Sequence, residues 1–179
     1  RRPASSQWRL SATTVATLAA GLPFFSIEDI AAERSLYHDF TNRSLAQQGL
    51  PVPLFTPERA AGVLRDACRP HHFSLYEYFL TDKAGHTQRM EAACPVINGL
   101  DRLLSHFITI MNPRETTLII TSDHGNVEDL SVKTHTRNPV PVLLHGWGSA
   151  DLKERIGSMT GIAPAIVGLL RDHVKAKKA

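Results

Sequence analysis

The chain has 179 residues, of which 42% are hydrophobic and 21% are charged, and its formal net charge is +3. This length predicts one compact domain rather than two. No run of apolar residues approaches the roughly 20 needed to cross a bilayer, which excludes a membrane-spanning protein. No basic stripe is interleaved with aromatic residues, which argues against a nucleic-acid-binding protein.

The two cysteines, Cys68 and Cys94, lie in segments that are predicted to be helical. Such sparse cysteine argues against a disulfide framework and suits a reducing compartment. No secretory signal is visible at the N-terminus, so we expect a cytoplasmic protein. The first residue is Arg1 rather than Met, and we expect further residues upstream in the parent protein.

The first 70 residues are predicted to be helical. Ser11 is placed to cap a helix that stops at Gly21. Ser26 opens a second helical stretch, whose apolar spacing continues to Gly49 and leaves room for a break. Thr56, followed by proline, is the expected N-cap of a further helix. No motif in this region identifies a function.

The rest of the chain alternates between strands and helices. The segments FSLYEYFL (73–80), TTLIIT (116–121) and PVPVLLHG (139–146) are predicted strands, and the second is the clearest because it is apolar and β-branched. Apolar residues at helical spacing predict a long helix over 90–108, and Thr160 is placed to cap a last helix. This order predicts an α/β fold with a mostly parallel sheet flanked by helices.

A parallel sheet is covered on both faces and usually has more strands than the two or three seen here. We therefore expect an incomplete fold, whose sheet is completed by a missing N-terminal segment or by another chain. The predicted division is a helical N-terminal region, 1–70, and an α/β core, 71–179, within one structural domain.

Acidic and imidazole side chains lie at the ends of the predicted strands. Asp82 and His86 occur in TDKAGH, Asp123 and His124 in TSDHGN, and His135 in HTRNPVP. Ligands of open α/β sheets bind outside the carboxyl ends of the strands, so we expect these five side chains to converge. Carboxylate and imidazole suit Zn²⁺ or Mn²⁺, and two such ions about 4 Å apart are typical of phosphoryl-transfer sites. The core is thus predicted to bind metal.

These motifs resemble the metal-binding end of the cofactor-independent phosphoglycerate mutase and alkaline phosphatase superfamily. The resemblance covers roughly residues 73–145. It implies an alkaline-phosphatase-like fold, two divalent ions (Mn²⁺ or Zn²⁺) and a phosphorylated small-molecule substrate. It also implies that Asp82, His86 and His135 hold one ion, while Asp123 and His124 supply half of the ligands of the other.

In such enzymes a Ser or Thr nucleophile and a further Asp come from the first strand and the helix after it. The early hydroxyls of this chain do not follow a strand that ends in Asp-Gly, so we expect the nucleophile to lie upstream of Arg1. These hydroxyls belong to Ser5, Ser6, Ser11, Thr13 and Thr14.

Other functions and roles stay open from sequence alone. The same metal core is implied for a sulfatase, a phosphodiesterase or a phosphopentomutase relative, and a non-catalytic fragment or a degenerate metal-binding domain is a further alternative. Lys83 and Arg137 flank the ligands as candidates for phosphate binding or as solvated loop charges. Asn126 and Glu128 are candidates for orienting His124 or for capping the loop after it.

Overall fold

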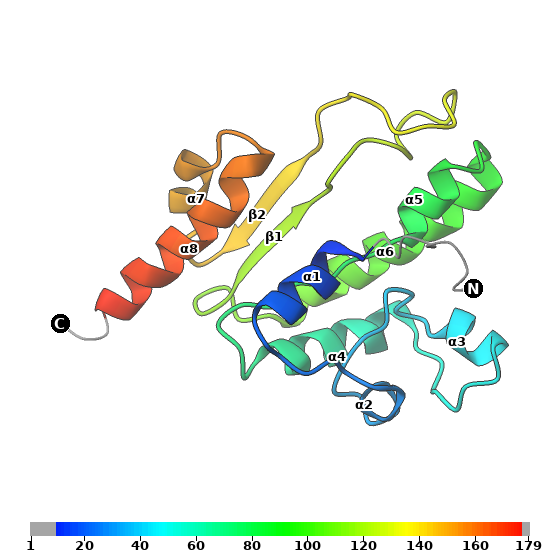
Figure 1. Cartoon of the computed structure of the whole chain (residues 1–179), viewed down its shortest axis with the longest axis horizontal. Helices are drawn as coiled ribbons and strands as arrows, with labels where there is room; N and C mark the ends of the chain where they lie inside the picture. Colours follow the sequence, from blue (N-terminus) through cyan, green and yellow to red (C-terminus); the bar gives the residue numbers. More distant parts are fainter. Residues whose placement is uncertain (1–9, 177–179) are drawn as a thin grey trace, which may run out of the picture.

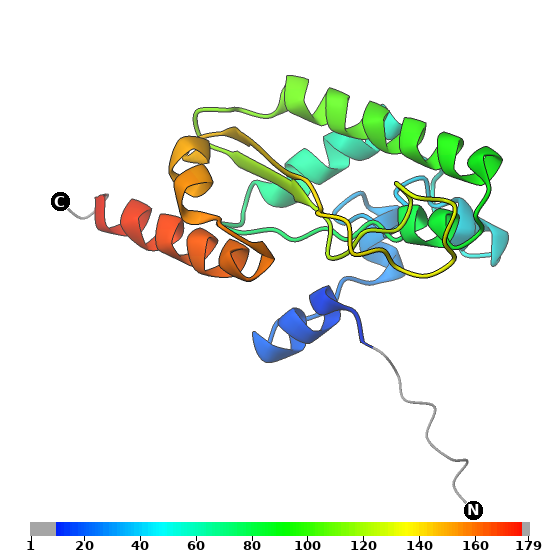
Figure 2. The same ribbon diagram turned by 90° about the horizontal axis from the view of Figure 1, so that it is seen from above.

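The structure is a computed structural model that describes residues 10–176, so Arg1, Ser5 and Ser6 lie outside the described residues. A two-stranded sheet lies between two groups of helices, with α4 and α6 on one side and α7 and α8 on the other (Figures 1 and 2). Over residues 10–176, no helix is both long and apolar enough to cross a membrane.

The N-terminal region is helical, as predicted, but its helices are short. Helix α1 (Ala12–Ala19) is capped by the hydroxyl of Ser11, and α2 (Ile27–Ala31) begins with a capping box between Ser26 and Asp29. The second predicted stretch does break, because α2 ends well before α3 (Arg43–Gln47). Helix α1 contains no buried residue and lies apart from the layers in Figure 2.

A buried carboxylate organises the turn before α3. Asp39 is only 4% exposed and accepts hydrogen bonds from the backbone and hydroxyl groups of both Thr41 and Ser44, at 2.6–3.1 Å. Burial raises the pKa of Asp39, but these hydrogen bonds outweigh that effect and lower its pKa overall. The turn is therefore stabilised by the charged form of Asp39.

The main core lies between α4 (Pro57–Cys68) and α6 (Met90–Ile110). Thr56 caps α4 through a bond from the Arg59 N–H, and proline occupies the first turn as predicted. Small residues on α4 let α6 approach closely, so that Leu103 and Phe107 are almost fully buried. The buried members of this cluster are Phe40, Phe55, Ala60, Ala61, Val63, Leu103, Phe107 and Met111.

The sheet differs from the prediction. Strands β1 (Thr117–Thr121) and β2 (Val142–Gly146) lie within two of the predicted segments, but they pair antiparallel, with Ile119 opposite Leu144. The prediction of a mostly parallel sheet is wrong for residues 10–176, whose sheet is this one pair. The connecting residues, 122–141, contain no helix, and a chain that returns without a crossover helix pairs antiparallel.

Residues 73–80 were also expected to form a strand, and this expectation is wrong, because Leu80 begins α5 (Leu80–Gly85) and residues 73–79 form no strand. Residues 73–79 lie between α4 and α5 without pairing to either strand. Tyr76 and Tyr78 pack against the main core, whereas Phe73 and Leu75 are more than half exposed. Burial raises the pKa of Tyr78 to about 12. The segment is aromatic and apolar, as a buried strand would be, but it lacks the neighbour whose backbone would complete the hydrogen bonds.

The C-terminal helices cover the other face of the sheet. Leu152 of α7 (Ser149–Arg155) packs with Leu169 of α8 (Met159–Ala176) against Ile119 and Leu144. The neighbouring strand residue, Leu118, packs on the main core instead. Adjacent side chains of a strand point to opposite faces, so β1 joins the two helical layers.

Candidate metal centre

Helix α5 positions the first two predicted ligands. Asp82 lies on α5, and His86 is the residue that ends it, four positions later. Residues four apart lie on the same face of a helix. The Nε2 atom of His86 is accordingly 3.3 Å from Oδ1 of Asp82. TDKAGH was expected to follow the end of a strand, but it forms a helix that brings the two side chains together directly.

His135 reaches the same carboxylate from the loop between the strands. Its Nε2 atom lies 3.3 Å from Oδ1 of Asp82, and the ligand atoms of Asp82, His86 and His135 are all within 4.8 Å of one another. In a tetrahedral site with ligands 2.0–2.1 Å from the ion, two ligand atoms are about 3.3–3.4 Å apart. The spacing and the donor types therefore fit a divalent ion.

A backbone carbonyl orients His86. The Nδ1 atom of His86 lies 2.7 Å from the carbonyl oxygen of Lys133, which can only accept a hydrogen bond. Nδ1 therefore carries a proton, and Nε2 is the nitrogen that faces Asp82. Metal-binding histidines commonly donate their second N–H in this way. Gln88 also donates to the carbonyl of Ser131, at 3.0 Å, and so helps to dock this loop on the end of α5.

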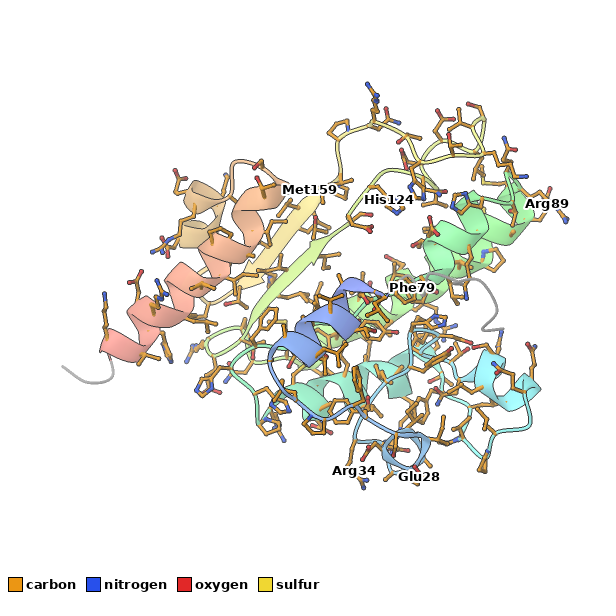
Figure 3. All side chains as sticks on the ribbon, viewed as in Figure 1. Glu28, Arg34, Phe79, Arg89, His124 and Met159 are labelled. Atoms are coloured by element: carbon orange, nitrogen blue, oxygen red, sulfur yellow. The ribbon has the colours of Figure 1, made fainter. Side chains whose placement is uncertain are left out.

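Asp123 and His124 follow β1 but differ in their surroundings. Nε2 of His124 lies 3.9 Å from Oδ1 of Asp82, and the His124 ring stacks on that of His135, with centroids 3.6 Å apart. Figure 3 shows His124 on the side of β1 that faces α5. The side chain of Asp123 is 84% exposed and lies 3.6 Å from Nε2 of His124. The structure thus brings four predicted ligands together and leaves Asp123 at the edge.

The second ring nitrogen of His124 is an unusual feature. Nδ1 is buried and has no hydrogen-bond partner among residues 10–176. A buried, unpaired polar atom is costly, and such atoms call for an explanation such as a bound ion. Nε2 of His124, which faces Asp82 and Asp123, is therefore the nitrogen placed to bind an ion.

Asn126 contacts a candidate ligand directly, whereas Glu128 bonds to residues of the loop that follows His124. Asn126 is buried, and its side-chain amide donates to Oδ1 of Asp82 at 2.9 Å instead of orienting His124. The carboxylate of Glu128 accepts hydrogen bonds from Asn126, Thr136 and Asn138. These bonds, that from Thr136 foremost, lower the pKa of Glu128 to about 2.

Several contributing groups could not be singled out from sequence. The carbonyl of Lys133 is part of the backbone, so no residue type marks it. Thr136 and Asn138 bond to Glu128, but in the sequence only their closeness to His135 points to a role at the centre.

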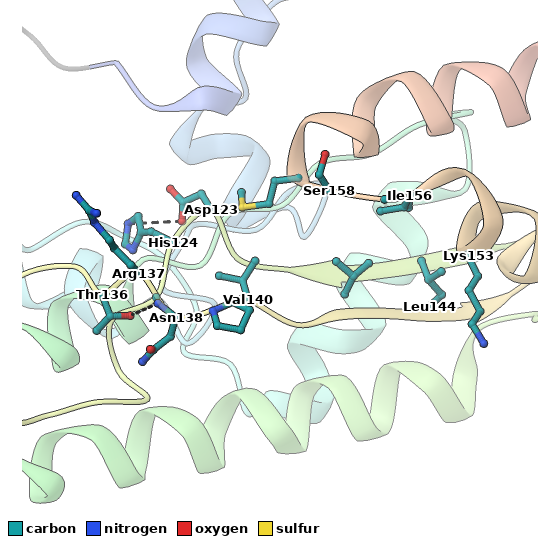
Figure 4. A pocket seen from close by; sticks show the side chains of 15 residues that line it. Asp123, His124, Thr136, Arg137, Asn138, Val140, Leu144, Lys153, Ile156 and Ser158 are labelled. Atoms are coloured by element: carbon teal, nitrogen blue, oxygen red, sulfur yellow. Dashed lines mark hydrogen bonds and ion pairs between the residues drawn. The ribbon is translucent and has the colours of Figure 1, made fainter.

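A cavity of about 590 Å³ opens beside Asp123 and His124. Figure 4 shows these residues and Arg137 at one end of the cavity and Lys153 at the other, with Leu144 of β2 between them. The cavity therefore has cationic side chains at both ends. Lys83, the other residue considered for phosphate binding, does not line it.

The early hydroxyl groups that the structure describes form local contacts. The hydroxyl of Ser11 lies 2.8 Å from that of Thr13 and 3.0 Å from that of Thr14, at the start of α1. Thr13 also donates to Glu77. These bonds use the hydroxyls for capping and packing, so none of the three serves as a candidate nucleophile.

Comparison with known proteins identifies the family. A sequence profile of the metalloenzyme superfamily matches residues 58–171, which include the motifs around Asp82, Asp123 and His135. The chain belongs to the metalloenzyme superfamily. The resemblance inferred from those motifs is thereby confirmed. The matched region begins in α4 and ends in α8.

The curated relatives of this metalloenzyme-superfamily chain include several 2,3-bisphosphoglycerate-independent phosphoglycerate mutases. That of Desulforudis audaxviator is 31% identical over 131 residues, covering 68% of this chain and 26% of that protein. That of Synechocystis sp. is 32% identical over 143 residues, with the same two shares. The chain spans about a quarter of the length of these relatives. No solved structure matches the chain.

Proposed function

We propose that this chain holds most of the metal ligands of a metal-dependent phosphoryl-transfer enzyme, a phosphatase or phosphomutase of the phosphoglycerate mutase-like type. The observation that carries the proposal is the convergence of Asp82, His86 and His135, whose ligand atoms lie within 4.8 Å of one another. The relatives named above are phosphoglycerate mutases, and they support the same chemistry.

The proposed roles divide the ligands between two ions. Asp82, His86 and His135 hold one divalent ion, Mn²⁺ or Zn²⁺, and Asp123 and His124 contribute to a second. Bound ions of this kind supply Lewis acidity, which stabilises the charge that develops on the phosphoryl oxygens. Among residues 10–176 we assign no nucleophile.

The chain's own groups prepare this centre in two ways. The Lys133 carbonyl accepts a hydrogen bond from Nδ1 of His86 and so keeps Nε2 facing the centre. The amide of Asn126 keeps Oδ1 of Asp82 between the imidazoles. Because both side chains are already held in place, binding of an ion would cost less conformational entropy.

The proposed substrate is a phosphorylated small molecule, and the cavity beside Asp123 is its proposed site. Its volume of about 590 Å³ is in the usual range for small-molecule pockets. Arg137 lies at the end nearest His124, where a guanidinium can bind two oxygens of one phosphate. The phosphoryl group would therefore face the metal centre while the rest of the molecule fills the cavity.

Metal analysis of the purified chain tests the proposal. We expect Mn²⁺ or Zn²⁺ to bind, and Asp82→Asn and His135→Ala to lose most of that binding. Asp101→Asn, which changes an exposed carboxylate on α6 by the same chemistry, is the matched control and should bind as the unaltered chain does.

A phosphatase assay with an aryl phosphate completes the test. Turnover that depends on added metal and on Asp82 would support catalysis by this chain. Metal binding without turnover would support the ligand role alone, with the nucleophile supplied from outside residues 10–176. Failure to bind Mn²⁺ and Zn²⁺ even after supplementation would overturn the proposed function.

A further inference from the structure

The ligands of the candidate centre come from separate segments, which must be held in register. Asp82 and His86 belong to the end of α5, whereas His124 and His135 lie on two arms of the loop 122–141. The two arms meet at one backbone bridge, where the N–H of Thr136 donates to the carbonyl of Gly125 at 2.9 Å. A single bridge is weak, so further contacts must fix the arms.

Glu128 supplies those contacts. Its carboxylate accepts from the N–H of Asn126, at 2.5 Å, on the first arm. It also accepts from the hydroxyl of Thr136 and from the side-chain amide of Asn138, the latter at 3.1 Å, on the second arm. Three donors from both arms thus converge on one carboxylate. Hydrogen bonds to a charged acceptor are about twice as strong as neutral ones.

The neighbouring acidic residue shows that this arrangement is specific. Asp129 accepts only from the backbone and hydroxyl of Ser131, two residues away, among the contacts of residues 10–176. These bonds form a local turn and do not link the arms. The two carboxylates are adjacent in sequence, but only Glu128 spans the loop.

The space around the carboxylate is tightly filled. A Cβ atom at Gly125 would lie 2.1 Å from Oγ1 of Thr136 and 2.5 Å from Oε1 of Glu128. Only glycine lets the two arms approach this closely. The glycine of SDHG is therefore explained by contact between the arms.

The same network reaches the ligand on α5. Asn126, whose N–H is held by Glu128, directs its side-chain amide to Oδ1 of Asp82 at 2.9 Å and lies 3.4 Å from Nε2 of His86. Asn126 is 6% exposed, so its side chain has little freedom. We propose that Glu128 is a positioning residue, which aligns His124 with His135 and, through Asn126, fixes Asp82 for metal binding.

This inference rests on the proposed function, because it assigns a role in metal binding. The first experiment compares Glu128→Gln with Asp129→Asn, which removes the same charge one residue away. We expect Glu128→Gln to weaken Mn²⁺ binding by roughly 10–100-fold, as is usual for residues that support metal ligands, and Asp129→Asn to leave it unchanged. The visible spectrum of bound Co²⁺ should change in Glu128→Gln alone, since it reports the arrangement of the ligands.

Thr136 provides a second pair of variants. Thr136→Ser keeps the hydroxyl that donates to Glu128, and Thr136→Val removes it at nearly constant volume. We expect the serine variant to keep the Mn²⁺ affinity and the Co²⁺ spectrum, and the valine variant to lose both. A purely structural role would lower thermal stability without this contrast.

Amide hydrogen exchange of the metal-free chain separates the two proposals. Exchange at Thr136, whose N–H forms the bridge, should quicken in Glu128→Gln and not in Asp129→Asn. Unchanged exchange together with unchanged metal affinity would overturn the positioning role of Glu128 while leaving the proposed function intact. Absence of metal binding by the unaltered chain would overturn both.

Discussion

Gly85 offers a sharp test of how α5 supports the candidate centre. A Cβ atom added there would lie 1.5 Å from Oδ1 of Asn126 and 2.6 Å from its Cγ. Such contacts are far inside van der Waals range, so Gly85→Ala must push the Asn126 side chain aside. The hydrogen bond from Asn126 to Asp82, at 2.9 Å, would then be lost.

The expected magnitude combines two opposing effects. Losing a hydrogen bond to a charged group costs about 1.5–3 kcal/mol. Replacing glycine by alanine within a helix contributes about 0.5–1 kcal/mol of stability. We therefore expect Gly85→Ala to lower the free energy of unfolding by roughly 1–2 kcal/mol. Its affinity for Mn²⁺ should fall roughly 10–100-fold, because Asp82 is no longer held.

Urea unfolding and Mn²⁺ titration measure the two effects. Gly62→Ala on α4 is the control, since a Cβ atom there meets nothing within 4 Å and only the helical gain should appear. In the double variant with Asn126→Ala the clash is gone, so the two substitutions should couple by roughly 1–2 kcal/mol. Additive effects, or normal Mn²⁺ affinity in Gly85→Ala, would refute the reasoning.

Three further predictions concern the fold. Leu103→Ala should lower the free energy of unfolding by about 2–5 kcal/mol, whereas Ile108→Ala, at a position 39% exposed on the same helix, should cost much less in denaturant titration. Asp39→Asn should cost about 1–3 kcal/mol at neutral pH. The contribution of Asp39 to the free energy of unfolding is present above its unfolded pKa of about 3.9 and is lost as pH falls through its lower folded pKa. The free energy of unfolding of Asp39→Asn should therefore fall less between neutral and acidic pH than that of the unaltered chain. The pKa of Tyr78 is about 12 in the folded chain, against about 10 in the unfolded chain, so its contribution to the free energy of unfolding is complete below pH 10 and is lost as pH rises toward 12. In Tyr78→Phe, unfolding measured against pH should therefore show a smaller loss of stability at alkaline pH. An equal loss in the variant and in the unaltered chain would contradict this role of Tyr78.

The sequence predicted local features of the fold well. Ser11, Ser26 and Thr56 cap helices as expected, because a cap depends only on residues within one turn. The apolar, β-branched segment before Asp123 is a strand for a similar reason. Pairing direction and the unpaired state of residues 73–79 were missed, because they depend on which partners lie alongside, and local pattern does not encode that.

The candidate centre was predicted in its members more than in its geometry. The motifs, their place at predicted strand ends and the family resemblance marked Asp82, His86 and His135, and the structure brings them together. The route was different, since a helical turn and a loop deliver them in place of parallel strand ends. Glu128 joins the two arms of the loop because of the conformation of the loop, and no periodic pattern in the sequence predicts that conformation.

The position of the centre also affects the order of folding. Asp82 and Asn126 are 44 residues apart, and His86 and Lys133 are 47 apart, so these contacts close long loops. The strand pair can form through nearer contacts, such as the pairing of Thr121 with Val142, and the centre is complete only when this pair and the helical layer have docked. An ion bound by ligands from both parts would hold them together, and its binding free energy would stabilise their association directly.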